Sequence, residues 1–185
     1  PLHPLHPLHP LHPLHPLHRP PPLPLPPLPD WRLPMARFET LYTDQRRVDA
    51  PLEVAVNHFA DLDVIVAQYG DLESTERLGG GKIRLVQTER RDKGLVFQGR
   101  YTGEWRKEGS DRVVWQTHGD ENMWNRGEAR FTAVGEATEV HFTQTLVVDM
   151  PIPAILAKLA RRIVERELNV GMQAYFKRMC DSVPR

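Results

Sequence analysis

Residues 97–106 read FQGRYTGEWR, and this stretch decides the fold because its two faces differ at every step. In an extended chain, one face would carry Phe97, Gly99, Tyr101, Gly103 and Trp105. The other face would carry Gln98, Arg100, Thr102, Glu104 and Arg106. Alternation with a period of two predicts an antiparallel strand with one buried face. Glycines between aromatic residues indicate a bent strand, or a ring packed across them.

Similar segments lie on both sides of this strand. The predicted strands are 38–48, 72–78, 82–90, 97–106, 112–118, 123–134 and 138–148. Short connections rich in glycine and polar residues join the last six, including the turns 79–81 and 92–94, so these six form an antiparallel meander. Alternation points Trp115, Phe131 and Phe142 toward the same side as Tyr101.

Helical patterns follow the first strand and end the chain. Asp49 and Pro51 open a short helix, which the Asp49 carboxylate can cap, and a second short helix runs from about Asp61 to Tyr69 and ends at Gly70. Pro151 and Pro153 precede one long helix. This order predicts an α+β fold in which a curved seven-stranded antiparallel sheet wraps around the terminal helix. A cavity between sheet and helix is then expected.

The terminal helix carries two apolar stripes. The first is Ile152, Leu156, Leu159, Ile163 and Val170; the second is Leu168, Met172, Tyr175, Met179 and Val183. A straight helix with one buried stripe does not explain both. We favour a kink near 169–171. The alternative is that the first half packs against the ligand mouth, the loops or a second subunit.

The first 34 residues differ from the rest. Six Pro-Leu-His repeats fill residues 1–18, and a Pro/Leu-rich run continues to Pro29. On a polyproline II helix, which rises about 3.1 Å per residue, successive histidines lie roughly 9 Å apart, whereas metal ligands lie about 2 Å from their ion. We interpret residues 1–34 as a disordered leader, or as sequence upstream of a start at Met35. A metal or partner role is the alternative.

Composition excludes several classes of function. Residues 35–185 contain 22 Lys and Arg against 23 Asp and Glu, so no basic excess indicates nucleic-acid binding. Cys180 is the single cysteine, and His58, His118 and His141 lack metal-ligand spacing, so we expect no metal and no cofactor. No apolar run approaches the roughly 20 residues of a membrane span. These features indicate a cytoplasmic protein.

We expect structural roles for the three histidines, with His118 at the cavity rim as an alternative.

Several motifs resemble the helix-grip superfamily, which includes START lipid-transfer domains, polyketide cyclases and coenzyme Q-binding proteins. They are Val48-Asp49-Ala50-Pro51 with Glu53-Val54, Trp115, the series Gly127, Phe131, Gly135, Thr138 and Val140, and the segment Met172 to Arg178. The resemblance covers almost all of residues 38–183. It implies the same fold and a hydrophobic ligand such as a lipid, an isoprenoid quinone or a polyketide-like aromatic.

The candidate cavity residues are Phe97, Tyr101, Trp105, Trp115, Phe131, Phe142, Leu159 and Ile163. The preferred hypothesis is a noncatalytic carrier whose apolar ligand is held by burial, with the Tyr101 hydroxyl orienting a carbonyl or quinone oxygen. A second hypothesis is a cyclase- or dehydratase-like enzyme, with loop residues Asp120 or Glu121 reaching into the cavity. A third is an interaction module with a collapsed cavity, which binds a protein partner or a second copy weakly through the terminal helix.

Overall fold

The computed structural model describes residues 35–92, 95–119 and 121–185. The predicted leader (1–34), most of the predicted turn at 92–94 and the candidate loop residue Asp120 lie outside the described residues. The elements are β1 (Met35–Val48), α1 (Leu52–Ala60), α2 (Leu62–Tyr69), β2 (Leu72–Gly79), β3 (Lys82–Gln87), β4 (Arg90–Asp92), β5 (Leu95–Phe97), β6 (Arg100–Lys107), β7 (Arg112–His118), β8 (Met123–Val134), β9 (Ala137–Pro151) and α3 (Ala154–Asp181).

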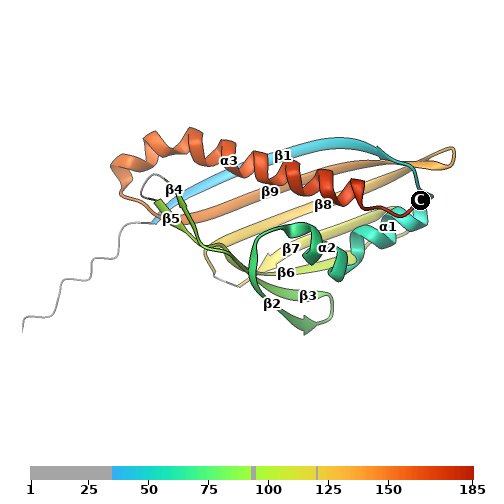
Figure 1. The fold of residues 1–185 in the computed structure, drawn as a ribbon, viewed down its shortest axis with the longest axis horizontal. Coiled ribbons are helices and arrows are strands. Elements are labelled where there is room, and N and C mark those ends of the chain that lie inside the picture. The colour runs from blue at the N-terminus through green and yellow to red at the C-terminus, as the bar shows by residue number, and fades with distance from the viewer. Residues whose placement is uncertain (1–34, 93–94, 120) are drawn as a thin grey trace, which may run out of the picture. The chain divides into compact units, whose positions relative to one another are not determined.

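Seven strands form one antiparallel sheet in the order β1-β9-β8-β7-β6-β3-β2. The first strand therefore pairs with the last, with Met35 opposite Pro151 and Val48 opposite Thr138. Figure 1 shows α3 lying along the long strands, with α1 near its C-terminal end. This confirms the predicted seven-stranded sheet, long terminal helix and two short helices after the first strand.

Two predicted strands are shorter than expected, and Phe97 consequently lies outside the main sheet. The chain leaves β3 at Gln87 and forms a separate ribbon, β4–β5, before β6 begins at Arg100. Gly99 lies at this break: a Cβ there would approach Gln87 Oε1 to 2.5 Å and Met123 Sδ to 2.8 Å. A side chain would not fit at this point, and β5 ends at Phe97 whereas β6 begins at Arg100, so Phe97 and Tyr101 are not on one continuous strand.

The two short helices begin differently. The predicted Asp49 cap is wrong, because the N-cap position of α1 is Pro51 and no side chain caps the helix. Asp61 caps α2 by accepting hydrogen bonds from the backbone N–H groups of Asp63 (2.8 Å) and Val64 (3.4 Å). Gly70, with φ +92°, ends α2 in a conformation that favours glycine.

The two apolar stripes of α3 differ in burial, which the sequence did not predict. The buried stripe runs along the helix and includes Val164, Met172, Phe176 and Met179. In the predicted first stripe, Leu159 is 77% exposed and Ile163 is 43% exposed, and Ile152 precedes the helix. The two stripes occupy opposite faces of one helix, one buried and one exposed. The predicted kink is therefore not needed to explain them.

Candidate ligand-binding site between the sheet and the long helix

Five of the eight predicted cavity residues lie together on the face of the sheet that α3 covers. Tyr101, Trp105, Trp115, Phe131 and Phe142 are all buried in one cluster. Phe97 is half-buried on β5 and packs at the margin of that cluster. The exposed Leu159 and Ile163 lie on the outer face of α3, so the structure does not bring them to the aromatic lining.

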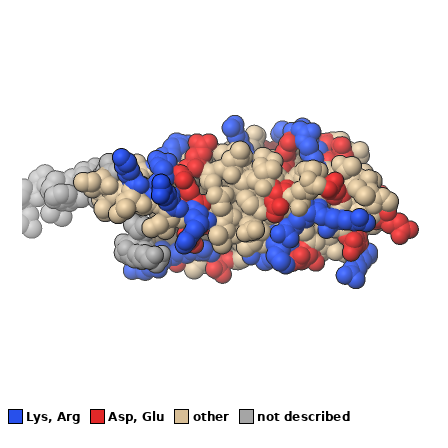
Figure 2. Space-filling model, turned by 90° about the horizontal axis from the view of Figure 1, so that it is seen from above, with Lys and Arg blue, Asp and Glu red and all other residues tan. Residues whose placement is uncertain are grey.

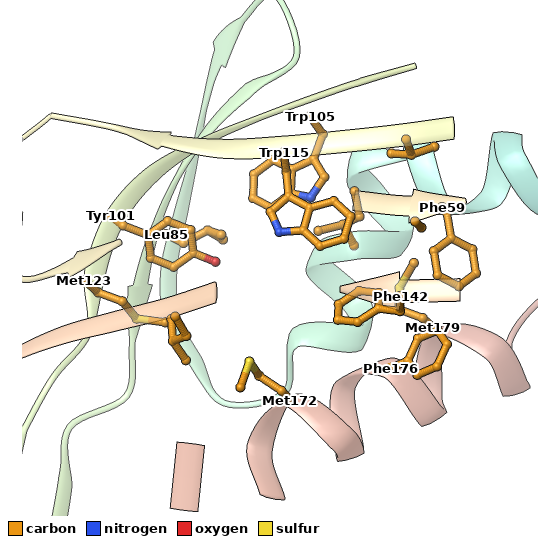
Figure 3. Close-up of a cluster of buried hydrophobic side chains, with 14 of the residues drawn as sticks. Phe59, Leu85, Tyr101, Trp105, Trp115, Met123, Phe142, Met172, Phe176 and Met179 are labelled. Carbon is orange, nitrogen blue, oxygen red and sulfur yellow. The ribbon is translucent and has the colours of Figure 1, made fainter. Parts of the chain in front are cut away.

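Aromatic rings fill much of the space between sheet and helix. Phe142 stacks on Trp115 with ring centroids 5.1 Å apart, and on Phe176 of α3 at 4.7 Å. Tyr175 joins this group 6.4 Å from Phe142, and Tyr69 of α2 connects it to Tyr101. Figure 3 shows Phe142, Phe176 and Phe59 grouped together, with Tyr101 and Leu85 on the far side of Met172.

Two glycines make room for the tryptophan rings. A Cβ at Gly127 would lie 2.5 Å from Cζ2 of Trp115, its cross-strand partner. A Cβ at Gly103 would overlap the ring of Trp105, two residues further along β6. The prediction that a ring packs across glycine in this strand is therefore confirmed. A larger side chain at either glycine would displace the indole beside it.

Two buried polar atoms inside this apolar region form no well-aligned hydrogen bond. Among the described residues, the Tyr101 hydroxyl lies near the side chains of Tyr69 and Asn125, but neither it nor Asn125 Oδ1 has a partner of acceptable geometry. Asn125 is held in place through its backbone N–H, which donates to Thr117 Oγ1 (2.8 Å). Buried polar side-chain atoms are usually paired, so such a pair of atoms indicates a place where a further polar group can bind.

The phenols around these atoms are held in the protonated form. Burial raises the pKa of Tyr69 to about 12 and raises the pKa of Tyr101 well above its usual value, with a further contribution from the neighbouring Tyr69 hydroxyl. Burial likewise raises the pKa of Tyr175. These hydroxyls can donate hydrogen bonds near neutral pH, but they cannot act as general bases there.

Sequence reasoning missed Asn125, Tyr69 and Tyr175 as members of this site. Extending the alternation Gly127, Ala129, Phe131 by one step back along β8 reaches Asn125, so that signal was present. Tyr69 ends α2, where no periodic pattern marks it. Tyr175 was placed on the correct helical stripe, but that stripe was not identified as the one facing the sheet.

Two hollows of the described surface lie on the opposite face of the sheet. One depression of about 350 Å3 is lined by charged side chains that include Arg106, Arg112 and Glu128. A second, of about 380 Å3, lies beside Arg37 and Trp124. Both are open to solvent and lie on the outer face, so neither is the apolar cavity that the sequence predicted between sheet and helix.

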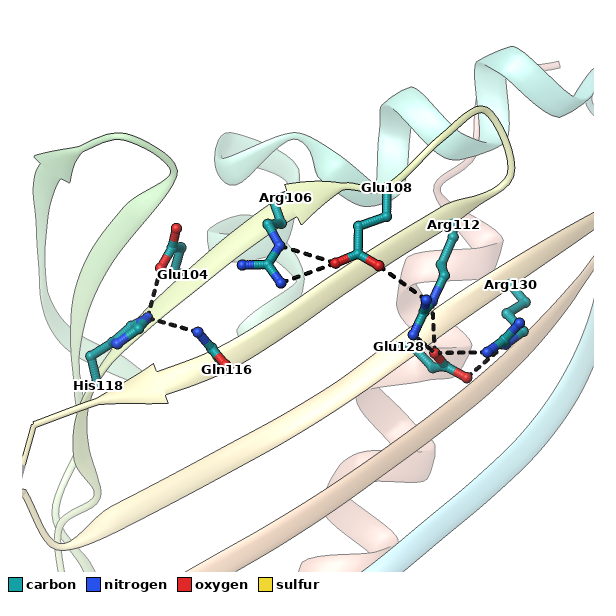
Figure 4. A network of polar contacts seen from close by, with 8 residues as sticks. All are labelled: Glu104, Arg106, Glu108, Arg112, Gln116, His118, Glu128 and Arg130. Carbon is teal, nitrogen blue, oxygen red and sulfur yellow. Dashed lines mark hydrogen bonds and ion pairs between the residues drawn. The ribbon is translucent and has the colours of Figure 1, made fainter.

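The outer face carries a network of ion pairs (Figure 4). Glu108 contacts both Arg106 and Arg112 at 3.0 Å, and Arg112 contacts Glu128 at 2.5 Å. The hydrogen bond from Arg130 and the charge and hydrogen bond of Arg112 lower the pKa of Glu128. Alternating cations and anions of this kind neutralise one another, which is typical of a solvated sheet face.

The other candidate polar residues also lie outside the aromatic region. His118 contacts Glu104 (2.6 Å) on the outer face, so its proposed place at a cavity rim is wrong. Glu121 Oε1 pairs with the outward-facing Arg84 (2.9 Å). His141 lies 3.7 Å from Glu139, also on the outer face.

His58 and Ser182 form a contact that resembles a nucleophile–base pair, but its hydrogen bonding does not fit one. His58 Nε2 lies 2.9 Å from Ser182 Oγ, and that hydroxyl donates to the backbone carbonyl of Met179 (3.1 Å). Because the serine proton is already donated, the hydroxyl accepts from the imidazole rather than giving it a proton. The contact joins α1 to the end of α3.

Within residues 35–92, 95–119 and 121–185, no three His, Cys, Asp or Glu side chains converge where they could bind a metal ion. In the same part of the chain, none of the helices has the length and apolar character needed to cross a membrane.

Solved structures match the chain, whereas no protein-family model and no curated protein does. TTHA0849 from Thermus thermophilus is 20% identical in sequence, with a TM-score of 0.58. The match covers 78% of this chain and 97% of the TTHA0849 chain. The Zhui aromatase/cyclase from Streptomyces sp. R1128 is 15% identical (TM-score 0.60), with coverages of 78% and 93%. A START superfamily protein from Mycobacterium smegmatis is 11% identical (TM-score 0.57), with coverages of 77% and 96%. These likenesses confirm the predicted START-like helix-grip fold.

Proposed function

We propose, from its START-like helix-grip fold, that this chain binds a hydrophobic aromatic molecule carrying a hydroxyl or carbonyl group. The observation that carries the proposal is a pair of neighbouring buried polar atoms, Tyr101 Oη and Asn125 Oδ1, that form no well-aligned hydrogen bond among the described residues and lie inside an aromatic lining. A ligand hydroxyl could accept from Tyr101 and donate to Asn125 at once. The surrounding rings would hold the apolar body of the ligand by burial, at about 25 cal/mol per Å2.

Ligand entry requires the rings to move, because Phe142, Tyr175 and Phe176 pack closely against one another. Two of these three rings come from α3, and Tyr69 comes from α2. A small displacement of α3 from the sheet would therefore open the aromatic lining without disturbing strand pairing. The binding region is consistent with a carrier that closes over its ligand.

Equilibrium dialysis of 2-naphthol and naphthalene tests this function. One good hydrogen bond contributes about 0.5–1.5 kcal/mol, so 2-naphthol should bind several-fold more tightly than naphthalene. The double variant Tyr101→Phe/Asn125→Leu should bind the two compounds equally. Tyr42→Phe is the matched control, because that hydroxyl already donates to Asp44 (2.8 Å) and should leave the preference unchanged.

An interaction module with a collapsed cavity is the second candidate, and the close stacking of Phe142 between Trp115 and Phe176 favours it. Such a module would bind neither compound, and native mass spectrometry after expression would give the mass of the chain alone. A stoichiometric aromatic ligand that co-purifies with the chain would exclude this candidate.

An aromatase/cyclase-like enzyme is a third possibility, raised by the solved cyclases of this fold. The protonated Tyr101 hydroxyl could donate a hydrogen bond to a carbonyl oxygen of the substrate. This bond would stabilise the negative charge that develops on that oxygen when a nucleophilic carbon of the substrate attacks the carbonyl carbon. Cyclisation of a poly-β-ketone chain by the protein, abolished in Tyr101→Phe, would favour this possibility over a carrier.

A further inference from the structure

The outer face of α3 carries an unusual amount of apolar surface. Half of the large apolar side chains that are exposed in the described residues belong to this helix. We call four of them the outer stripe: Ile155, Leu156, Leu159 and Ile163. Ile155 is 85% exposed. The four residues of the outer stripe lie on the side of α3 opposite the buried stripe that packs on the sheet. Apolar surface gathered in this way marks an interaction site more often than isolated exposed residues do.

Cations lie beside the outer stripe. Lys158, Arg162 and Arg166 are spaced four residues apart and are exposed, so they form a row along one side of it. Arg161 pairs with Glu165 (3.3 Å) and Arg166 with Glu167 (2.8 Å), whereas Lys158 and Arg162 form no ion pair within the described part of the chain. Figure 2 shows blue side chains beside tan surface at the end of the molecule where α3 begins. The result is an amphipathic surface whose positive charge comes from Lys158 and Arg162.

We propose that the outer stripe and its cations form a docking surface for anionic lipid headgroups. A helix with an apolar row flanked by Lys and Arg lies in the plane of a membrane interface, its apolar side chains inserted and its cations at the phosphates. This mode does not require the helix to span the bilayer. A second copy of the chain fits less well, because a two-fold contact through this surface would bring two identical cation-bearing surfaces together.

Vesicle flotation with the full chain tests the proposal. The protein should float with phosphatidylcholine vesicles that contain phosphatidylserine, and much less with phosphatidylcholine alone. Each cation contributes about fivefold to such partitioning, so Lys158→Gln/Arg162→Gln should weaken it roughly 25-fold. Arg47→Gln/Arg126→Gln is the matched control. Both control arginines are exposed, and neither forms an ion pair within the described part of the chain.

A fluorescent label at position 159 reports insertion directly. Cys180 is buried, so a cysteine introduced by Leu159→Cys is the accessible thiol for an environment-sensitive dye. The dye emission should shift to shorter wavelength on adding phosphatidylserine vesicles. The emission of the same dye at position 41, introduced by Leu41→Cys on the exposed side of β1, should not change.

Three outcomes would overturn the proposal. The first is no flotation with anionic vesicles. The second is flotation that is equally strong in the α3 double variant and the control. The third is sedimentation showing a dimer that Ile155→Asp/Leu159→Asp dissociates, because a second copy would then cover the stripe. Unchanged circular dichroism of each variant verifies that it is folded. None of these readouts depends on a ligand in the aromatic region, so they are independent of the proposed function.

Discussion

Replacing Tyr101 by phenylalanine should stabilise the ligand-free protein. The hydroxyl is fully buried and has no partner of acceptable geometry among the described residues. A buried polar group left in this state costs about 1–3 kcal/mol, whereas deleting one oxygen leaves only a small void. We therefore expect Tyr101→Phe to raise the free energy of unfolding by about 1 kcal/mol, which raises the Tm by roughly 2–4 °C in a domain of this size.

Urea denaturation followed by circular dichroism gives this free energy. Tyr42→Phe is again the comparison, because it removes a hydrogen bond to Asp44 and should lower stability by about 0.5–1.5 kcal/mol. Opposite signs for the two variants would support the assignment of Tyr101 as an unsatisfied donor. If Tyr101→Phe is destabilising to the same degree as Tyr42→Phe, the hydroxyl is already bonded inside the protein. It would then not be free for a ligand.

Three further predictions concern packing, pH and reactivity. Gly127→Ala should destabilise the fold by about 1–3 kcal/mol, because the added methyl overlaps the Trp115 ring. Gly171→Ala, in an open part of α3, should instead stabilise it by up to about 1 kcal/mol in the same urea titration. Burial lowers the pKa of His58, so the unfolded chain binds a proton at higher pH than the folded one, and stability should fall as the pH drops below 6.5. His58→Gln should flatten that dependence between about pH 7.5 and 5.5, and an unchanged slope would assign it to other groups. Burial raises the pKa of Cys180 to about 12, so iodoacetamide should modify it at neutral pH only as fast as the protein unfolds, as mass spectrometry would measure. Rapid modification of the folded protein would contradict that burial.

The sheet could be predicted from sequence because its signals are local. Alternation along residues 100–107 and 123–134 defines which face is buried, and the glycines at 79–81, all with positive φ, define a turn. The break at Gly99 could not be predicted. It depends on the approach of Gln87 and Met123, which are distant in sequence.

The buried face of α3 could not be predicted from local sequence patterns. Both apolar stripes have the period of a helix, so periodicity alone does not tell which one packs on the sheet. The choice depends on the partner: Val164 and Phe176 meet the apolar interior, while Leu159 points away from it. Five aromatic residues of the candidate site followed from alternation. The polar pair inside it depends on how Tyr101 and Asn125, from strands on either side of β7, meet in space.

The pairing of β1 with β9 has a consequence for how the chain is made. The two strands are about 100 residues apart, and ribosomes add about 5–20 residues per second. For several seconds or longer, β1 is outside the ribosome without its hydrogen-bonding neighbour, and its buried side chains, such as Phe38, are without α3. We expect ribosome-associated chaperones to bind the nascent chain during this interval. A circular permutant that places β1 directly after β9 should fold with less assistance.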